Sequence, residues 1–462
     1  MSALWTHADL RAATHGHTHG AIPATGVSID TRTLKPGDLF VALVGEIGDG
    51  HDHVAAALAK GAAGAMVHRQ PDGVPANAPL LHVQDTLAGL QALGAFARAR
   101  FHGHVIAVTG SVGKTTTKEM LRTILAAQGP TWAAEASHNN QWGVPLTLAR
   151  SPADASFCVA EIGMNHAGEI LPLAKLARPN VALITSIERA HLGFLGSIEA
   201  IADEKASIMA GLEPGGVAVL PGDNLMLQRL VEKAPAFMLF GESPEADARL
   251  LSARSDADGV DVYAQFGEQR VSFRLAAPGR HMAMNALAAI AGAEALGCEL
   301  DRCVAALEGF SPLSGRGLRR RIAVPGGTAL LLDESYNASA IAMRAALSVL
   351  ALQPANRRIV VFGDMLELGA EGPAEHTNLA PDIAEVADLL FACGPLTRLT
   401  YEAMPREKRG AHAADSAALA PAVATAVREG DAILVKGSLG SRMKMIVQAL
   451  DGQALRITPE ER

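Results

Sequence analysis

The segment Val105-Ile-Ala-Val-Thr-Gly-Ser-Val-Gly-Lys-Thr-Thr-Thr117 decides the fold predicted for the centre of this chain. Its apolar first half predicts a buried strand, and apolar residues at helical spacing in residues 118–127 predict a helix after it. Between them, Gly110 and Gly113 let the backbone curl so that successive N–H groups face one anion, and the start of the helix adds the positive end of its dipole. The segment therefore predicts a phosphate-binding loop.

The side chains of this loop suit a nucleoside triphosphate. Lys114 would reach the outer phosphates, and Thr115 or Thr116 would supply a hydroxyl to magnesium. Val108 stands where the usual pattern has glycine, so an ordinary glycine-rich turn is the alternative. The residues predicted to contact the nucleotide are Thr109, Gly110, Ser111, Val112, Gly113, Lys114, Thr115 and Thr116.

Length and composition limit the classes of protein. At 462 residues the chain is long enough for about three domains of roughly 150 residues each. The net charge of -8 argues against a broad nucleic-acid-binding surface, because binding to the phosphate backbone needs clustered positive charge. Residues 1–11 contain no apolar core of signal-peptide length, and no longer stretch predicts a membrane span. We therefore expect a cytoplasmic protein, and a monomer.

The cysteines and a histidine cluster predict no metal site. The cysteines, at positions 158, 298, 303 and 393, lie in or beside apolar segments without metal-type spacing. We expect them to be small buried hydrophobic residues rather than disulfides or ligands. The histidines of His15-Gly-His-Thr-His19 lack a further anchoring element nearby, which predicts a solvated loop.

Strand and helix patterns alternate along the whole chain, which predicts an α/β protein of three domains. We place an N-terminal α/β domain in residues 1–103, a central domain with a doubly wound, largely parallel sheet in residues 104–314, and a Rossmann-like C-terminal domain in residues 315–462. Residues 245–276 alternate in a polar, strand-like way and predict an antiparallel insertion or edge.

Two side chains that follow central strands are candidate magnesium ligands. Glu161 comes directly after a predicted strand, and at the carboxyl end of a parallel strand it would face the same crevice as the phosphate loop. A surface glutamate that ends a strand is the alternative. His191 lies beyond the strand that ends at Thr185, but magnesium prefers oxygen, so the residues alone favour an ordinary histidine there.

Lys205 lies in a predicted helix, where a solvated lysine would be unremarkable. With a pKa near 10.4, only about one unmodified lysine in 2,500 is neutral at pH 7, and an ammonium beside Mg²⁺ is repelled. Carbamylation by CO₂ would turn the side chain into an anion, the form able to ligate a metal. Carbamylated Lys205 is therefore a further candidate ligand.

Two groups of residues remain open to more than one interpretation. His281 and Asn285 are four residues apart and share one face of a predicted helix, which alone indicates an ordinary helix face. The arginines of the segment Arg316-Gly-Leu-Arg-Arg-Arg321 could contact an acidic surface. Their place at a predicted domain junction, however, suits an anion clamp that closes on a bound nucleotide.

Together these segments resemble the Mur ligases over nearly the whole chain. In the first domain, Ser28-Ile-Asp-Thr-Arg32, residues 36–43 and Asp49-Gly-His51 are similar to the UDP-binding domain of that family. The central matches are the phosphate loop, Asn139-Asn140, Gly143-Val-Pro145, Glu161-Ile-Gly-Met-Asn165, Ala190-His-Leu192 and Gly279-Arg-His281 with Asn285. In the last domain, Asp333-Glu-Ser-Tyr-Asn-Ala338, residues 361–369 and Val435-Lys-Gly-Ser438 resemble the D-alanyl-D-alanine-adding branch.

The resemblance implies a role for each matching residue. Thr115, Glu161 and His191 would hold magnesium, Asn285 would meet the adenine, and Arg316 and Asp333 would bind phosphate and ribose. The expected catalytic set is Lys114, Glu161, His191 and Lys205, and the expected substrate-binding set is Ser28, Asp30, Thr31, Arg32, Asn139 and Asn140. Two positions depart from the family: Ser186 stands where asparagine is common, and Leu439 where a basic residue often follows Lys-Gly-Ser.

The implied activity is ATP- and Mg²⁺-dependent amide formation in peptidoglycan precursor synthesis. The carboxylate of a UDP-N-acetylmuramoyl-tripeptide would attack the γ-phosphate of ATP, giving ADP and an acyl phosphate, from which the amine of D-alanyl-D-alanine would displace phosphate. A sibling amino-acid-adding enzyme or a folylpolyglutamate synthetase is the alternative of the same type. A P-loop ATPase without ligation is the alternative of another class.

Overall fold

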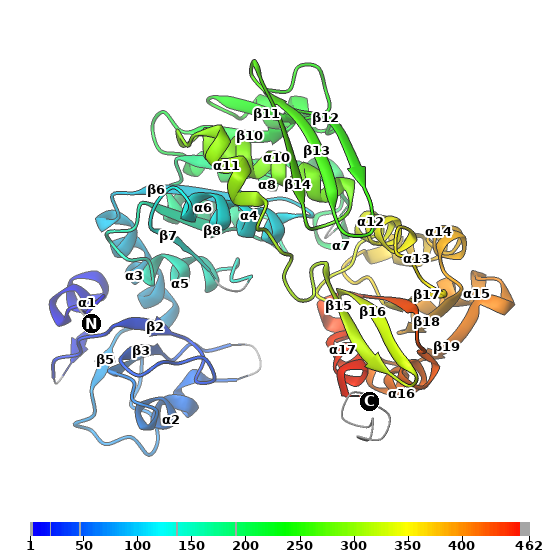
Figure 1. Cartoon of the computed structure of the whole chain (residues 1–462). Coiled ribbons are helices and arrows are strands. Elements are labelled where there is room, and N and C mark those ends of the chain that lie inside the picture. Colours follow the sequence, from blue (N-terminus) through cyan, green and yellow to red (C-terminus); the bar gives the residue numbers. More distant parts are fainter. Residues whose placement is uncertain (1–2, 19, 46–47, 135–136, 190–191, 453–462) are drawn as a thin grey trace.

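The computed structural model describes residues 3–18, 20–45, 48–134, 137–189 and 192–452. These residues form three α/β lobes, each built on one sheet, with the N-terminal lobe at the lower left of Figure 1, the central lobe at the top and the C-terminal lobe at the lower right. The predicted α/β class is confirmed.

The central sheet places the phosphate loop at its topological switch point. Its nine strands have the order β14-β13-β12-β11-β10-β9-β6-β8-β7. Strand β6 (His104–Thr109) lies between β8 (Phe157–Glu161) and β9 (Val181–Ile184) and pairs with both in parallel. The strand order reverses at β6, which is where doubly wound sheets bind ligands. The other strands are β7 (Thr131–Ala133), β10 (Val217–Pro221), β11 (Phe237–Gly241), β12 (Ala248–Ser255), β13 (Val260–Phe266) and β14 (Gln269–Leu275).

Helices cover both faces of this sheet. On one face, α4 (Lys114–Ala126), α10 (Arg280–Glu294) and α11 (Leu300–Leu307) pack around Ile106 and Val108. On the other, α5 (Gly143–Ala149), α6 (Ile170–Ala177) and α8 (Ile198–Ala206) pack around Val105 and Ala107. Successive residues of a strand point to opposite faces, so a strand that is apolar throughout is buried on both.

The expected antiparallel edge is confirmed. Strands β12, β13 and β14 form an antiparallel meander at one end of the central sheet, although β12 joins β11 in parallel.

The N-terminal lobe is a five-stranded sheet of order β1-β5-β4-β3-β2. Its parallel strands are β2 (Gly26–Ser28), β3 (Asp38–Val41), β4 (Gly64–Val67) and β5 (Leu80–His82), with β1 (His17–Thr18) antiparallel to β5. Helices α1 (His7–Thr14) and α3 (Thr86–Arg100) cover one face and α2 (Val54–Ala59) the other. Helix α3 also packs against α5, so it joins this lobe to the central one.

His15 and His17 are exposed, as expected, but the expected loop at residues 15–19 is wrong for His17 and Thr18, which form β1. Their backbones pair with the edge of β5, and two residues are too few to show a strand pattern in the sequence. The third histidine of the cluster, His19, lies outside the described residues.

The C-terminal lobe is a six-stranded sheet of order β15-β16-β20-β17-β18-β19. Strand β15 (Leu318–Val324) is antiparallel to β16 (Gly327–Glu334), and the others, β17 (Arg357–Gly363), β18 (Leu389–Cys393), β19 (Arg409–Ala413) and β20 (Asp431–Lys436), are parallel. Helices α12 (Ala340–Ala351) and α14 (Ala380–Val386) cover one face, and α16 (Ser416–Ala426) and α17 (Lys444–Asp451) cover the other. Helices α13 (Gly372–Asn378) and α15 (Thr397–Ala403) pack beside α14.

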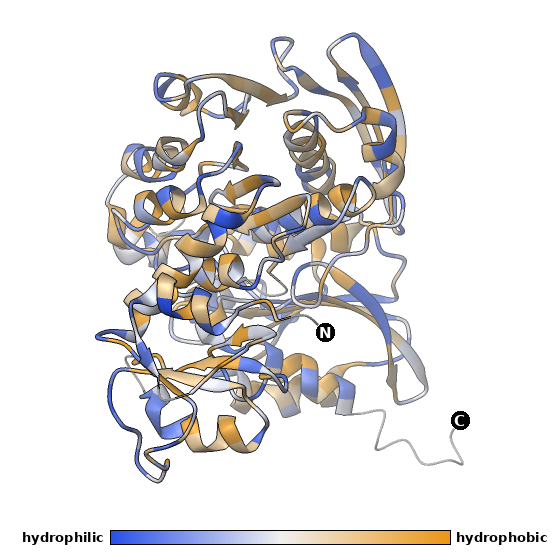
Figure 2. Cartoon of the chain, turned by 90° about the vertical axis from the view of Figure 1, so that its left-hand side faces the viewer, coloured by the Kyte–Doolittle hydropathy of each residue, from blue (hydrophilic) through white to orange (hydrophobic). Residues whose placement is uncertain are grey.

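Hydropathy follows this layering. In Figure 2, hydrophilic residues colour most peripheral loops, and hydrophobic residues colour much of the sheets and the inner faces of the helices. All four cysteines are free thiols, and those at 158, 303 and 393 are buried, as expected, whereas Cys298 is only partly buried. Among the described residues, no helix has the length and apolarity needed to cross a bilayer.

Arg98 ties α3 to the central lobe. Its buried guanidinium donates hydrogen bonds to the carbonyls of Ala177 at 2.8 Å and Arg178 at 2.7 Å, where α6 ends. The last carbonyls of a helix have no partner within the helix, so this arginine satisfies the buried carbonyl of Ala177 and the more accessible carbonyl of Arg178.

We expect Arg98→Met to lower the free energy of unfolding by about 2–4 kcal/mol, because methionine fills the space but leaves these carbonyls without a donor. Urea unfolding followed by circular dichroism measures the change. Arg122→Ala is the control, since Arg122 forms a half-exposed pair with Glu119 and should change stability by no more than about 0.5 kcal/mol. Equal stability of the two variants would contradict the assignment.

Candidate active site

The phosphate loop depends on two glycines that approach other segments closely. Gly110 has φ +144°, and a Cβ there would lie 1.9 Å from the Thr185 hydroxyl. Gly113 has φ +87°, and a Cβ there would lie 2.5 Å from Oδ1 of Asn285. Helix α4 begins directly afterwards, at Lys114, so the first N–H groups of the helix face the mouth of the loop.

The loop is anchored to the segment after β9. The Ser111 N–H donates to the carbonyl of Ser186 at 2.9 Å, and the Val112 N–H donates to the Ser186 hydroxyl at 3.1 Å. The Ser111 hydroxyl donates to the Glu188 carbonyl at 3.0 Å and accepts from its N–H at 2.9 Å. Ser186 therefore supports the phosphate loop through both its carbonyl and its hydroxyl. This is the position at which the resemblance to the Mur ligases leads to an expected asparagine.

Two oxygen-bearing side chains meet behind the loop. The Thr115 hydroxyl lies 3.0 and 2.9 Å from the two carboxylate oxygens of Glu161, and both residues are almost fully buried. The amide of Asn139 donates to the same carboxylate at 2.8 Å. Asn139, expected to bind substrate, is thus placed where it orients the candidate metal ligand.

This pair fits magnesium. Mg²⁺ is usually held by one or two carboxylates together with substrate phosphates and water, all through oxygen. Glu161 provides such an oxygen at the carboxyl end of β8, and Thr115 provides one from the first turn of α4, beyond the carboxyl end of the neighbouring strand β6. Among the described residues there is no cluster of three or more His, Cys, Asp or Glu side chains that could hold a metal. His191 lies outside the described residues.

Lys114 and Lys205 share one electrostatic environment. The Lys114 ammonium donates to the Gly110 carbonyl at 2.7 Å and to the Ser111 carbonyl at 3.4 Å. Burial lowers the pKa of Lys114. Burial also lowers the pKa of Lys205 well below its ordinary value, and the charge of Lys114 lowers it further while Glu204 opposes the shift. Lys205 lies on α8 and is 1% exposed, so the solvated alternative is wrong.

Arg316 reaches the loop from the C-terminal side. Its guanidinium donates to the Ser137 hydroxyl at 2.8 Å, and that hydroxyl lies 3.1 Å from the Thr115 hydroxyl. The same guanidinium lies 3.9 Å from the ring centroid of Tyr336. Arg316, Thr115 and Thr116 line a recess at this point, together with Glu119, Phe310, Pro312 and Leu313.

Asp333 is engaged with the connection between the two lobes. Its carboxylate is 1% exposed and accepts hydrogen bonds from the Ser314 hydroxyl and the Gly315 N–H, both at 2.8 Å. It also accepts from Ser335, through the hydroxyl at 2.6 Å. The residue expected to bind ribose thus holds the connecting segment in this structure.

The expected four-arginine clamp is wrong for three of its members. Arg319, Arg320 and Arg321 lie on β15. Arg320 pairs with Asp451 on α17, Arg321 donates to Thr328 at 3.3 Å, and Arg319 donates to backbone carbonyls of the central lobe. Because side chains alternate along a strand, neighbouring arginines cannot all face one anion.

Three C-terminal motifs meet at the carboxyl ends of β16, β20 and β17. The buried Lys436 ammonium donates to Glu334 at 3.3 Å and to the Asn337 carbonyl at 3.0 Å. The Ser438 hydroxyl accepts the Leu366 N–H at 2.9 Å. Leu439, next in the chain, is 63% exposed.

A loop of the C-terminal lobe touches the central lobe beside the site. The Glu367 carbonyl accepts the Gly193 N–H at 3.1 Å, and a Cβ on Gly369 would lie 2.8 Å from Cα of Gly193. The charge of Glu367 acts on Lys114, whose pKa it raises against the effect of burial. The two lobes therefore approach each other around the phosphate loop.

The expected N-terminal substrate residues lie apart from this cluster, in the loop after β2. Ser28 is buried and its hydroxyl donates to the Asp30 carbonyl at 3.1 Å. Asp30 pairs with Arg32 at 2.6 Å, which lowers the pKa of Asp30, and the Thr31 carbonyl accepts from Lys60 at 2.8 Å. In the central lobe, Asn140 accepts the Trp142 and Gly143 N–H groups where α5 begins.

Sequence reasoning gave no role to three residues at the site, Ser137, Ser186 and Glu367. Ser186 was noted only as a departure from the family, although its position just after a parallel strand was an available signal, since such positions face the ligand crevice. Glu367 lies in the matching residues 361–369, but no local pattern indicates its contact with the central lobe or the place of Ser137, because their partners are distant in the sequence.

Comparisons with known proteins match this architecture segment by segment. The Mur ligase family catalytic-domain model matches residues 23–100, the Mur ligase middle domain matches residues 108–293, and the Mur ligase glutamate ligase domain matches residues 320–439. The chain belongs to the Mur ligase family.

Relatives and solved structures agree over nearly full length. The UDP-N-acetylmuramoyl-tripeptide–D-alanyl-D-alanine ligase of Escherichia coli K12 is 36% identical and aligns over 96% of this chain and 98% of its own. The ligase of the same name from Bacillus subtilis is 33% identical, over 92% and 93%. MurF from Acinetobacter baumannii superposes with a TM-score of 0.84 at 33% identity, covering 97% of this chain and 98% of that one. MurF from Thermotoga maritima in complex with ADP superposes with a TM-score of 0.77 at 25% identity, over 93% and 98%.

These findings confirm the predicted family and the three-part α/β fold. This Mur ligase is an ATP-dependent ligase. The roles of its individual site residues stay predictions.

We expect Glu161→Gln to lower Mg²⁺-dependent turnover of this Mur ligase by at least about a hundredfold, the usual scale for losing one charge-stabilising group. The amide keeps the size of the side chain but lacks the negative charge that a metal requires. Binding of the UDP-linked substrate, measured by calorimetry, should stay nearly unchanged because its expected residues lie in the N-terminal lobe. Glu169→Gln is the control, because Glu169 is a half-exposed glutamate that pairs with His166. An equal loss of UDP-substrate affinity in Glu161→Gln would make Glu161 structural.

Proposed function

We propose that this Mur ligase joins D-alanyl-D-alanine to UDP-N-acetylmuramoyl-tripeptide in peptidoglycan precursor synthesis, forming ADP and phosphate. The observation that carries the proposal is the meeting of the phosphate loop, the Thr115–Glu161 pair and Arg316 at one point. The near full-length likeness to ligases of that name supports the choice of substrates.

The nucleotide would lie across the central and C-terminal lobes. Lys114 and the loop amides would bind the phosphates, Asn285 the adenine, and Arg316 a phosphate. Thr115, Glu161 and His191 would hold Mg²⁺, which neutralises developing charge when bound. Asp333 would reach the ribose once its bonds to Ser314 and Gly315 rearrange. The proposed domain boundaries are 103/104, directly before β6, and 314/315, shortly before β15.

The other substrates would approach from the two outer lobes. Ser28, Asp30, Thr31, Arg32, Asn139 and Asn140 are the proposed contacts of the UDP-linked substrate. The exposed Leu439, in place of a basic residue, gives the proposed dipeptide side an apolar contact. We place the enzyme in the cytoplasm, as a monomer.

The residues suit both halves of the reaction. Lys114 and Arg316 supply positive charge where the γ-phosphoryl group transfers to the tripeptide carboxylate. The same charges support the tetrahedral oxyanion when the dipeptide amine attacks the acyl phosphate. The contact of Glu367 with Gly193 shows the lobes approaching beside the loop, which would limit access of water to the acyl phosphate.

Carbamylated Lys205 is the proposed additional anion of the site. Its lowered pKa leaves more of the side chain as free amine, the form whose nitrogen attacks CO₂ and then releases a proton to give the carbamate. Lys205 lies near the positive charge of Lys114, which would attract the carbamate.

We expect ¹³C-bicarbonate to label wild-type enzyme with one carbamate carbon, detectable by NMR and absent from Lys205→Ala. Lys205→Ala should lose activity, and added short carboxylic acids should restore part of it by supplying the missing anion. Lys175→Ala is the control, because Lys175 is an exposed lysine on α6. This variant should keep both the carbamate signal and the activity. Full activity of Lys205→Ala without added acid would end the proposal.

We expect the tripeptide carboxylate to be phosphorylated before the dipeptide is joined. With ¹⁸O in that carboxylate, the label should appear in the released phosphate, and hydroxylamine should trap an activated carboxyl when the dipeptide is omitted. Label that stays with the peptide or passes to AMP would contradict phosphoryl transfer and indicate adenylation.

Phosphate release also separates the proposal from its alternatives. It should require both UDP-N-acetylmuramoyl-tripeptide and D-alanyl-D-alanine for sustained turnover. Release with ATP alone would indicate an ATPase, and turnover with a different amine or acid would indicate a sibling ligase.

A further inference from the structure

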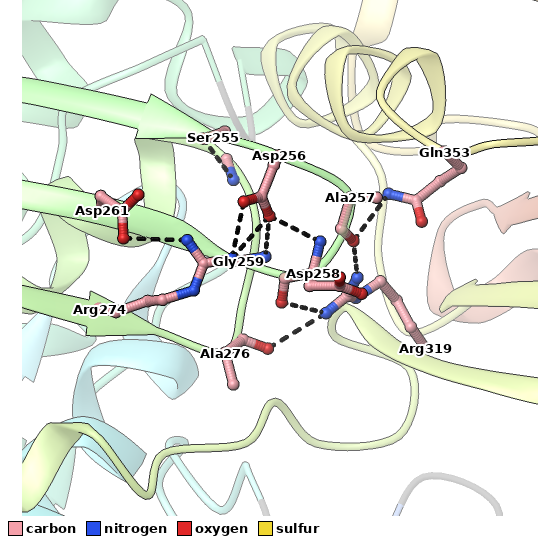
Figure 3. A network of polar contacts seen from close by, with 11 residues as sticks. Ser255, Asp256, Ala257, Asp258, Gly259, Asp261, Arg274, Ala276, Arg319 and Gln353 are labelled. Carbon is pink, nitrogen blue, oxygen red and sulfur yellow. Dashed lines mark hydrogen bonds and ion pairs between the residues drawn. The ribbon is translucent and has the colours of Figure 1, made fainter.

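The tip of the β12–β13 hairpin, residues 255–259, lies in the contact between the central and C-terminal lobes. Arg319 of β15 donates hydrogen bonds to the carbonyls of Ala257, of Asp258 at 2.7 Å and of Ala276 at 3.2 Å (Figure 3). One C-terminal side chain therefore binds two neighbouring segments of the central lobe through three carbonyls.

A second C-terminal side chain converges on the same tip. Gln353, which follows α12 and is 2% exposed, donates to the Ala257 carbonyl at 3.3 Å and to the Val349 carbonyl of its own helix at 3.0 Å. The Ala257 carbonyl is therefore shared by Arg319 and Gln353, as Figure 3 shows.

The hairpin tip is held in shape before it meets these donors. The Asp256 carboxylate accepts the N–H groups of Asp258 and Gly259, both at 2.9 Å. Arg274 of β14 pairs with Asp256 at 2.7 Å, which lowers the pKa of Asp256 to about 2, and with Asp261 at 2.9 Å. Two of the carbonyls that accept from Arg319, those of Ala257 and Asp258, thus belong to a turn that is held in shape by its own lobe.

The tip is continuous with both halves of the nucleotide site. On the central side, the Ser255 hydroxyl accepts the Gly279 N–H at 3.1 Å, directly before α10. That helix carries Asn285, which abuts Gly113 of the phosphate loop. On the C-terminal side, Arg316 lies three residues before Arg319 and reaches the loop through Ser137.

We infer that Arg319 is a positioning residue for the nucleotide. Its hydrogen bonds to the hairpin tip hold the C-terminal lobe in the orientation in which Arg316 reaches the phosphate loop. Residues 316–319 then have two attachments to the central lobe, one at the loop and one at the hairpin tip. With the second removed, the orientation of the C-terminal lobe is held less firmly, while the contacts of Gln353 and Glu367 with the central lobe remain. The inference rests on the proposed use of this site for ATP.

The test compares Arg319→Met with Arg321→Ala, whose arginine lies on the same strand and contacts Thr328 of the adjacent strand. Calorimetry with ADP, which binds without ligation, should show an affinity at least about tenfold weaker in Arg319→Met, because Arg316 is then no longer held in place for its charge-assisted contact with phosphate. Affinity for UDP-N-acetylmuramoyl-tripeptide should stay within about twofold, because distant sites without shared partners behave independently. Small-angle scattering should show a broader distribution of interatomic distances, and Arg321→Ala should match wild type in all three measurements.

Arg319→Lys and Gln353→Leu extend the test. Lysine restores a cation without the planar fork of donors and should give an intermediate ADP affinity. Gln353→Leu removes the second donor to the Ala257 carbonyl and should also lower the affinity for ADP. This variant keeps the inference testable if Arg319→Met does not fold.

Unchanged ADP affinity and unchanged scattering in Arg319→Met and Gln353→Leu would overturn the inference. An equal loss of affinity for ADP and for the UDP-linked substrate would also overturn it, because that outcome indicates general damage to the fold. The binding and scattering measurements do not require ligation. Failure of the wild-type enzyme to join the dipeptide would therefore count against the proposed function, and not against the positioning role of Arg319.

Discussion

The carboxylate of Glu161 is buried at the end of β8, and it accepts hydrogen bonds from Thr115 and Asn139. A buried carboxylate without such donors would cost several kcal/mol, so the groups around it are strongly constrained. Thr115 must come from the start of α4, and Asn139 from the segment before α5. The position of one charge thus determines how the phosphate loop and two neighbouring segments meet.

From this carboxylate, polar contacts continue to the C-terminal lobe. Thr115 lies beside Ser137, Ser137 accepts from Arg316, and Arg316 stacks on Tyr336. A change at the candidate metal site is therefore linked by direct contact to the segment that connects the lobes. Asp333, which clamps Ser314 and Gly315, holds the same connection from the other side. Nucleotide binding and lobe orientation consequently depend on shared residues.

The sequence predicted the elements that local patterns specify. Strand β6, the turn at Gly110 and Gly113 and helix α4 follow from an apolar run, two glycines and helical spacing within residues 105–127. The place of Glu161 beside the loop followed from the rule that parallel strands deliver their carboxyl ends to one edge. The prediction failed for Arg319, Arg320 and Arg321. Their closeness in the sequence suggested that they would face one anion together, but on a strand successive side chains point to opposite faces of the sheet.

The sequence by itself therefore determined the fold class, the phosphate loop and the family resemblance, since each depends on residues close together in the chain or on the order of motifs. Only the tertiary structure decided that Asn139 orients Glu161, that Ser186 supports the phosphate loop and that Arg319 donates hydrogen bonds to the tip of the β12–β13 hairpin. The physical reason is that these contacts join segments from 22 to 74 positions apart in the sequence. A hydrogen bond of this kind depends on how sheets and lobes pack, and no local periodicity records it.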